Sequence, residues 1–276
     1  MTQGAPIPKL LYGTAWKEEH TEGLTTLALT AGFRGIDTAN QRKHYFEAAV
    51  GKAVQSAIGA GKLKRAELFL QTKFTFKDGQ DERLPYDPQA PIATQVRQSF
   101  DSSLQHFGTD YVDSLVLHGP SSRDGLKPAD IEAWRAIEAL ARDGRVRFVG
   151  VSNVTLGQLR ELLKIAEVAP RFLQNRCYAK TGWDRAVRQL CAEHAVLYQG
   201  FSLLTANRAE LQSAAFKALC QRTGRSAAEL VFRFAVEVGM LPLTGTSSAE
   251  HMRLDLGALE IPLERADVEL IEKLAG

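Results

Sequence analysis

Cysteine is scarce in this chain, and the three that it contains are Cys177, Cys191 and Cys220. Their odd number and the lack of a C-x-x-C spacing argue against a disulfide framework and against a cysteine-bound metal. We therefore expect reduced thiols in or near the core. The sequence also lacks an H-E-x-x-H pattern, so it predicts no metal site.

Long apolar runs are absent as well. No stretch reaches the roughly 18 uninterrupted apolar residues that a membrane helix requires, and Met1–Lys9 has no apolar core typical of a secretion signal. Neither sign of charge is in excess, because 34 Lys and Arg face 32 Asp and Glu, which leaves a net charge of +2. These absences predict a cytoplasmic protein with neither a membrane nor a nucleic acid as partner.

The sequence does contain apolar, strand-like runs that alternate with amphipathic helical runs from one end to the other. Most of the strand-like runs are apolar throughout, which is typical of strands in a parallel sheet that helices cover on both faces. The expected strands are Leu10–Tyr12, Phe33–Ile36, Leu68–Thr72, Ser114–Leu117, Phe148–Val151, Phe172–Gln174, Val196–Gly200 and Met240–Leu243.

Helical patterns separate these strands. Ser226 and Glu229 open one of them with a capping box, in which each side chain satisfies a free backbone N–H group. A loop-like stretch, Asp78–Pro91, is expected as an insertion after the third strand. The expected helices are Thr21–Ala31, Phe46–Gly59, Ile92–His106, Ile131–Arg142, Leu156–Ala166, Asp184–Glu193, Ala209–Thr223, Ser226–Val236 and Ala266–Leu274.

Eight strand–helix units in 276 residues predict a single domain, residues 1–276, that folds as a closed (β/α)8 barrel, or TIM barrel. An open, doubly wound sheet is the alternative. Its nucleotide site requires a glycine-rich first turn, and Gly13–Trp16 (GTAW) does not match the G-x-G-x-x-G pattern. The barrel is therefore the expected fold.

Polar side chains follow three successive strands of the expected barrel, at the end where such barrels have their active sites. Asp37 closes the second strand, Lys73 the third and His118 the fourth. A charged side chain beside a buried barrel is costly unless it is paired, and Asp37 and Lys73 on adjacent strands can pair with each other. Each residue alone could be structural, but an acid, a base and an imidazole together favour a catalytic site.

Four ordered motifs carry a resemblance that runs from about Leu10 to the end of the chain. Gly32–Ala39 (GFRGIDTA) looks like the second-strand motif of the aldo-keto reductases, and Leu70–Lys73 (LQTK) is similar to their third-strand lysine motif. Asp110–Pro120 (DYVDSLVLHGP) and Gly144–Asn153 (GRVRFVGVSN) are similar to the motifs of the fourth and fifth strands. The resemblance implies the (β/α)8 fold and an oxidoreductase that interconverts carbonyls and alcohols with a nicotinamide coenzyme.

The resemblance also implies a catalytic tetrad of Asp, Tyr, Lys and His. Asp37, Lys73 and His118 match it directly. The family pattern has its tyrosine five residues after the aspartate, where this chain has Arg42. We expect a short insertion that makes Tyr45 the general acid; the alternative is that Tyr45 only packs at the start of a helix.

The chemistry explains why these residue types would act together. Reducing a carbonyl requires a hydride on carbon, which the coenzyme supplies, and a proton on oxygen. A phenol holds its proton at neutral pH, and an ammonium beside it lowers the phenol pKa toward the working pH. In this scheme Asp37 keeps Lys73 charged, and His118 donates a hydrogen bond to the carbonyl oxygen.

The coenzyme that the resemblance implies is NADP(H), with NAD(H) as the alternative. Ser152, Asn153 and Gln174 would bind the carboxamide, and Phe201 would stack on the nicotinamide. Gly245 and His251 stand where phosphate-binding relatives have a lysine and an arginine, which puts NADP(H) in doubt. The expected coenzyme-binding residues are Gly13, Thr14, Asp37, Ser152, Asn153, Gln174, Phe201, Ser202, Leu204, Gly245, Thr246, His251 and Asp255.

The expected substrate is a small carbonyl compound, contacted by Trp16, Tyr45 and His118, and the expected oligomeric state is a monomer. Two alternatives remain. One is a catalytically weak, nucleotide-sensing barrel, which the displaced tyrosine favours. The other is a Schiff-base aldolase with Lys73 as nucleophile, which would require a depressed lysine pKa. The neighbouring Asp37 argues against the aldolase, because it favours the charged ammonium.

Overall fold

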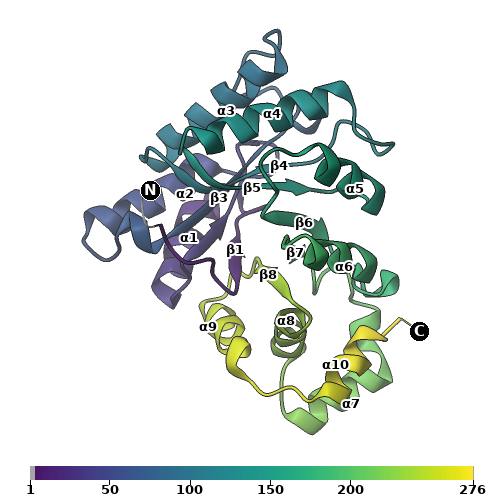
Figure 1. Cartoon of the computed structure of the whole chain (residues 1–276). Helices are drawn as coiled ribbons and strands as arrows, with labels where there is room; N and C mark the ends of the chain where they lie inside the picture. The colour runs from purple at the N-terminus through teal and green to yellow at the C-terminus, as the bar shows by residue number, and fades with distance from the viewer. Residues whose placement is uncertain (1–3, 276) are drawn as a thin grey trace.

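The computed structural model describes residues 4–275 and is a closed barrel of eight parallel strands (Figure 1). Each strand pairs with the next along the chain, and β8 pairs with β1 to close the ring. The strands are β1 (Leu11–Gly13), β2 (Gly35–Asp37), β3 (Phe69–Phe74), β4 (Val112–Leu117), β5 (Val146–Ser152), β6 (Phe172–Arg176), β7 (Leu197–Phe201) and β8 (Met240–Thr244). Each expected strand overlaps one of these, so the predicted (β/α)8 fold is confirmed.

Helices surround the barrel (Figure 1). They are α1 (Thr21–Ala31), α2 (Glu47–Gly59), α3 (Ile92–Phe107), α4 (Pro128–Arg142), α5 (Leu156–Ile165), α6 (Arg185–Glu193), α7 (Ala214–Thr223), α8 (Ala227–Glu237), α9 (Ala249–Gly257) and α10 (Arg265–Glu272). None of the helices in the described part of the chain is long and apolar enough to cross a membrane.

Two helical segments differ from the sequence predictions. The expected helix Ala209–Thr223 is divided into a 3-10 turn, Glu210–Gln212, and α7, because the Ser213 hydroxyl accepts a hydrogen bond from the Phe216 N–H and caps a new helix. The sequence pattern does not predict the bounds of α9. The apolar pattern of this helix is weak. Its buried residues are Met252 and Asp255, and the second of these is an acid.

The core has two parts. The larger part lies between the strands and the helices and includes the buried Trp134 and Trp183. The smaller part fills the barrel with large side chains from alternating positions, among them Phe69 on β3 and Phe172 on β6, whose rings meet edge to face 5.7 Å apart. The barrel is therefore a filled scaffold whose polar groups gather at the strand ends.

The strand register brings the polar residues of the carboxyl ends to one level. Asp37 on β2 pairs with Gln71 on β3, and Ser152 on β5 pairs with Gln174 on β6. The stretch Asp78–Pro91 has only part of one 3-10 turn before α3 begins, which confirms the expected loop after the third strand. This end of the barrel carries the candidate site.

Candidate active site

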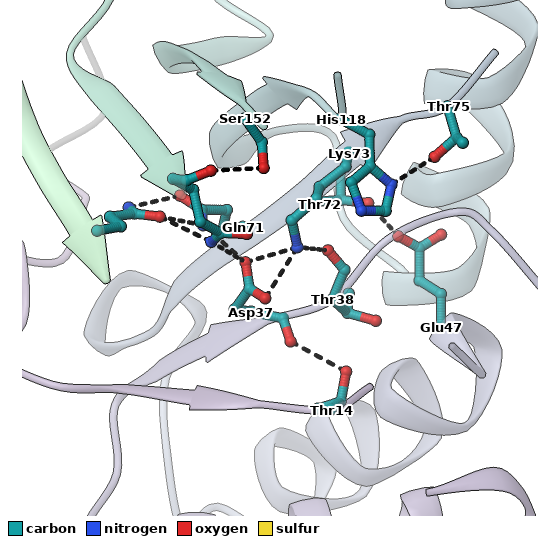
Figure 2. Close-up of polar contacts among 12 residues, drawn as sticks. Thr14, Asp37, Thr38, Glu47, Gln71, Thr72, Lys73, Thr75, His118 and Ser152 are labelled. Carbon is teal, nitrogen blue, oxygen red and sulfur yellow. Dashed lines mark hydrogen bonds and ion pairs between the residues drawn. The ribbon is translucent and has the colours of Figure 1, made fainter. Parts of the chain in front are cut away.

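A buried ion pair forms the base of the site (Figure 2). The Lys73 ammonium lies 2.7 and 2.8 Å from the two Asp37 carboxylate oxygens and donates a third hydrogen bond of 2.7 Å to the Thr38 carbonyl oxygen. Asp37 is 2% exposed and Lys73 is 1% exposed. An ammonium has three N–H donors, so these contacts use all of them. The pairing expected from adjacent strand ends is present.

Tyr45 lies beside this pair. The Lys73 Nζ atom is 5.0 Å from the centre of the Tyr45 ring, and the Tyr45 and His118 rings meet edge to face with centres 5.8 Å apart. The residue sits at the end of a tight turn, because its N–H donates to the Gln41 carbonyl oxygen at 3.0 Å. The structure thus brings the four residues of the expected tetrad together.

Arg42, at the position where the family pattern has tyrosine, does not join this group. Its guanidinium pairs with the carboxylates of Glu18 and Glu19 in the β1–α1 loop, at 3.3 and 3.5 Å. The guanidinium also stacks 4.0 Å from the ring centre of Phe46. The turn between Arg42 and α2 therefore directs the arginine toward Glu18 and Glu19, while Tyr45 reaches the ion pair.

Glu47 is the first residue of α2 and lies two residues after Tyr45. Its side-chain contacts hold the start of this helix in place. Its buried carboxylate accepts a hydrogen bond from the Thr72 hydroxyl on β3, and its other oxygen lies 2.8 Å from Nδ1 of His106 on α3. These contacts tie the start of α2 to a strand and to the next helix; Figure 2 shows Glu47 beside Thr72. Sequence reasoning missed Glu47, because nothing in a single sequence distinguishes it from a solvated first-turn acid.

His118 is held by a residue of the neighbouring strand loop. Its Nδ1 lies 2.7 Å from the Thr75 hydroxyl, and its backbone N–H donates to the Phe74 carbonyl oxygen at 2.9 Å. Burial, reinforced by the positive charge of Lys73, lowers the pKa of His118 to about 3. The imidazole is therefore neutral at physiological pH and can donate one hydrogen bond.

Burial dominates the electrostatics of the other two titratable groups. It lowers the pKa of Lys73, and the charge and hydrogen bonds of Asp37 oppose that change. It raises the pKa of Tyr45, and the negative charge of Asp37 raises it further. In this arrangement Tyr45 is firmly protonated, so it can donate a proton but is a poor base.

The residues expected at the coenzyme carboxamide lie on two neighbouring strands. The Ser152 hydroxyl donates to the Gln174 backbone oxygen at 2.7 Å, and the exposed Asn153 side chain donates to the His118 backbone oxygen at 2.7 Å. Asn153 has a backbone φ of 55°, a left-handed conformation that suits asparagine. Asn153 also donates to the Ser152 hydroxyl at 3.0 Å, so this hydroxyl and this amide lie together at the barrel mouth, beside His118.

Other expected coenzyme residues also lie at strand ends. Phe201 is half-buried at the top of β7 and packs on the barrel core, and Ser202 after it has a φ of 57°. Leu204 is half-buried in the same loop. On the opposite side, Gly13 ends β1, and the buried Thr14 donates to the Asp37 backbone oxygen at 3.0 Å.

The β8–α9 loop and the helix α9 contain the remaining expected coenzyme residues. Gly245 and His251 are exposed, whereas Asp255 is buried and accepts a 2.7 Å hydrogen bond from the Thr244 hydroxyl. Lys17, which sequence reasoning missed, donates a 2.7 Å hydrogen bond to the Gly245 carbonyl oxygen. Burial lowers the pKa of Lys17 to about 8. The loop is thus tied to the loop after β1.

The expected substrate residues are arranged around Tyr45. Trp16 is 71% exposed and stacks on the His44 ring, with centres 4.0 Å apart. Tyr45 also lines a cavity of about 320 Å³ between the β2–α2 loop, the segment 83–85 and α3. Trp16 and His118 do not line that cavity, so the three expected substrate residues share the barrel mouth rather than one enclosed pocket.

Comparison with known proteins identifies the family. The model of the Aldo/keto reductase family matches residues 10–275. The chain belongs to this family. An aldo/keto reductase from Brucella melitensis has the same fold, with a TM-score of 0.80 and 28% identity over 97% of this chain and 95% of that one.

Relatives with more specific names are similar over nearly their whole length. The NADPH-dependent alpha-keto amide reductase of Saccharomyces cerevisiae is 27% identical over 99% of this chain and 89% of its own. The NAD/NADP-dependent indole-3-acetaldehyde reductase of Schizosaccharomyces pombe is 28% identical over 96% of this chain and 89% of its own. A solved aldo-keto reductase complexed with NADPH shares the fold, with a TM-score of 0.82 and 22% identity over 99% of this chain and 86% of that one.

Proposed function

We propose that this protein reduces aldehydes or ketones to alcohols with a nicotinamide coenzyme, and that Tyr45 is the general acid. The observation that carries the proposal is the convergence of four side chains at the carboxyl end of the barrel. Tyr45 lies against both the Lys73 ammonium and the His118 ring, and Lys73 is paired with Asp37. Active sites of such barrels lie at this end.

Each residue has a separate task in this proposal. Tyr45, whose pKa is raised, holds the proton that the carbonyl oxygen needs when it becomes an alcohol. The neutral His118 donates a hydrogen bond to that oxygen, and its contact with Thr75 fixes the ring. Lys73 stabilises the phenolate left after proton transfer, and Asp37 keeps Lys73 in place.

The residues at the barrel mouth fit a nicotinamide coenzyme. A carboxamide has both donors and an acceptor, and the Ser152 hydroxyl with the amides of Asn153 and Gln174 can match both kinds of group. When bound there, the coenzyme would supply the hydride. The half-buried ring of Phe201 provides an apolar face beside these groups.

Three finer points are part of the proposal. We favour NADP(H), because one relative is named as NADPH-dependent. Another is named as NAD/NADP-dependent, and Gly245 and His251 supply neither a lysine nor an arginine. The substrate is a small carbonyl compound that enters past Trp16. The protein acts in the cytoplasm as a monomer.

The test combines coenzyme binding with turnover. We expect quenching of protein fluorescence by NADPH or NADH, and reduction of a reactive aromatic aldehyde with the coenzyme that binds. Tyr45→Phe should keep coenzyme binding and lose at least about a hundredfold in kcat, within the usual range for a general acid. Tyr111→Phe, at the opposite end of the barrel, is the matched control and should keep full activity. Absence of binding by either coenzyme would refute the proposed reaction.

A second candidate is a nucleotide-binding barrel with little turnover. The observation that favours it is that all three N–H donors of Lys73 are used by Asp37 and Thr38, while the pKa of Tyr45 is raised rather than lowered. Tight coenzyme binding without reduction of any reactive aldehyde would support this candidate. Turnover that Tyr45→Phe abolishes would exclude it.

A further inference from the structure

Three buried glutamines lie beneath the ion pair, inside the barrel. They come from β3 (Gln71), β6 (Gln174) and β7 (Gln199), and the most exposed of them is 3% exposed. Gln71 and Gln174 both donate to the same oxygen of Asp37, Oδ1, at 2.7 and 3.0 Å. Figure 2 shows the Gln71 amide beside Asp37, on the side opposite the Thr38 carbonyl.

Gln71 and Gln199 form a reciprocal amide pair across the barrel. Gln71 donates to the Gln199 oxygen at 2.8 Å, and Gln199 donates to the Gln71 oxygen at 2.9 Å. The pair joins residues 128 positions apart in the chain. Gln199 also accepts a 2.9 Å hydrogen bond from Gln174, so the three side chains form one connected network.

The negative charge of Asp37 gives this network a direction. An amide presents either its NH₂ or its oxygen to a neighbour, and an oxygen facing a carboxylate would be repelled. Gln71 and Gln174 must therefore direct their NH₂ groups to Asp37. Once these are oriented, Gln199 must accept from both of them, and its own NH₂ must face the Gln71 oxygen. One carboxylate thereby fixes three amides.

The consequence at the barrel mouth concerns Gln174. An amide nitrogen has two N–H donors, and Gln174 uses them on Asp37 and Gln199. The oxygen of the Gln174 amide is then left to bind a ligand. An amide oxygen accepts hydrogen bonds and cannot donate them. Gln174 pairs in register with Ser152, whose hydroxyl donates to its backbone, so the amide belongs to the barrel mouth.

Packing alone does not account for the amide pair. The neighbouring layer of the barrel interior is apolar and contains Phe69 and Phe172. Polar groups placed in such an interior are costly unless every one of them is hydrogen-bonded, and an apolar pair of similar volume would fill the space without that requirement. The amides give what an apolar pair cannot, namely a fixed direction of donors toward Asp37.

We propose that Gln71 and Gln199 are positioning residues that hold Asp37 and orient Gln174, so that the site recognises an N–H donor on its ligand through the Gln174 oxygen. The inference rests on the proposed function, in which that ligand is the carboxamide of the coenzyme. It adds two residues outside the expected site and a direction for the hydrogen bond. The same network keeps the Asp37 carboxylate facing Lys73.

The test uses full-length protein and two coenzymes. NADP⁺ has a carboxamide N–H, whereas its 3-acetylpyridine analogue has a methyl group in that place. We expect the wild type to bind NADP⁺ about tenfold more tightly than the analogue, from the loss of one oriented hydrogen bond. In Gln71→Leu/Gln199→Leu this ratio should fall below about threefold, because Gln174 loses its contact with Gln199, regains one free N–H and is held by Asp37 alone.

Two further measurements separate positioning from stability. Gln95→Leu, which removes another buried glutamine on α3, is the matched control and should keep the wild-type binding ratio. The pH profile of kcat in the double variant should shift relative to the wild type, because Asp37 loses a donor and no longer holds Lys73 in one place. If the double variant fails to fold, Gln199→Met replaces it, because this variant keeps the Gln71–Asp37 contact. The ratio of the affinities for NADP⁺ and its analogue should fall in this variant as well.

The outcomes are distinguishable. An unchanged binding ratio and an unchanged pH profile in a folded double variant would overturn the inference and leave the reductase function intact. A wild type that binds neither NADP⁺ nor NAD⁺ would overturn the proposed function and the inference with it. A reduced ratio in the double variant, with the Gln95→Leu control unchanged, would support the positioning role.

Discussion

At the scale of single residues, His118 combines a proposed catalytic role with a pKa far below its ordinary value. Its pKa is lowered from 6.5 to about 3, because burial and the Lys73 charge disfavour the imidazolium. In the unfolded chain His118 is neither buried nor close to Lys73. Between about pH 6.5 and 3 the unfolded chain therefore binds a proton on His118 that the folded protein does not. The free energy of unfolding should therefore fall as the pH falls through this range.

This gives a prediction about stability. From pH 7 to 5 the wild type should lose up to about 1.4 kcal/mol of unfolding free energy per pH unit more than His118→Asn, which removes the titrating group. Urea unfolding at a series of pH values measures the difference. His194→Asn, at an exposed histidine, is the control and should follow the wild type. Parallel pH dependence of wild type and His118→Asn would contradict the cause assigned to the lowered pKa.

The same residues indicate what a sequence can reveal about a site. The pairing of Asp37 with Lys73 was predictable, because both close neighbouring strands and neither can be buried alone. The Gln71–Gln199 pair was not, since it depends on β3 and β7 facing each other inside a closed barrel. The turn that brings Tyr45 rather than Arg42 to Lys73 was expected only as an insertion of unknown conformation.

At the scale of elements, α2 and α3 pack closely at a glycine. A Cβ atom at Gly51 would overlap the backbone oxygen of His106 at the end of α3, whereas one at Gly59, in the same helix, would meet nothing within 4 Å. The side chain of Gln55, one turn from Gly51, donates to that same oxygen at 2.8 Å. The glycine thus allows the helix that begins two residues after Tyr45 to approach its neighbour.

Gly51→Ala should therefore lower the free energy of unfolding by about 2–3 kcal/mol, because backbone atoms of α3 must move to admit the methyl group. Gly59→Ala should raise it by about 0.5–1 kcal/mol, since alanine costs less entropy than glycine in a helix. Urea unfolding midpoints compare the two variants. Equal effects would mean that helix propensity, not the contact with α3, determines the outcome.

Helices and strands can be predicted from the sequence where the signal lies within a few neighbouring residues. The capping box of Ser226 and Glu229 was predicted and is present at the start of α8, because it depends only on residues within one turn. The break before α7 was missed, since the single serine that caps it lies within an otherwise helical pattern. Strands were predicted from apolar runs, and their register followed from barrel closure rather than from any local feature.

At the scale of the whole molecule, the first and last units must meet to close the barrel. The strand β1 is only three residues long, and it pairs with β8 through Leu11–Leu243 and Tyr12–Thr244. Figure 1 shows the purple β1 beside the yellow β8. A side-chain contact reinforces the seam, because the buried Tyr12 hydroxyl donates a 3.0 Å hydrogen bond to the Thr246 backbone oxygen.

Tyr12→Phe should loosen this seam without unfolding the barrel. Removing one hydrogen bond should cost about 0.5–1.5 kcal/mol, and the loss should be concentrated where the loop after β8 meets β1. Hydrogen exchange of the segment 245–250 should therefore accelerate. Tyr86→Phe removes a buried hydroxyl that donates to the Thr75 backbone oxygen at 2.8 Å, far from the seam in sequence, and serves as the control. If both variants accelerate exchange in 245–250 equally, the effect is global, and the closure of the barrel does not depend on this contact.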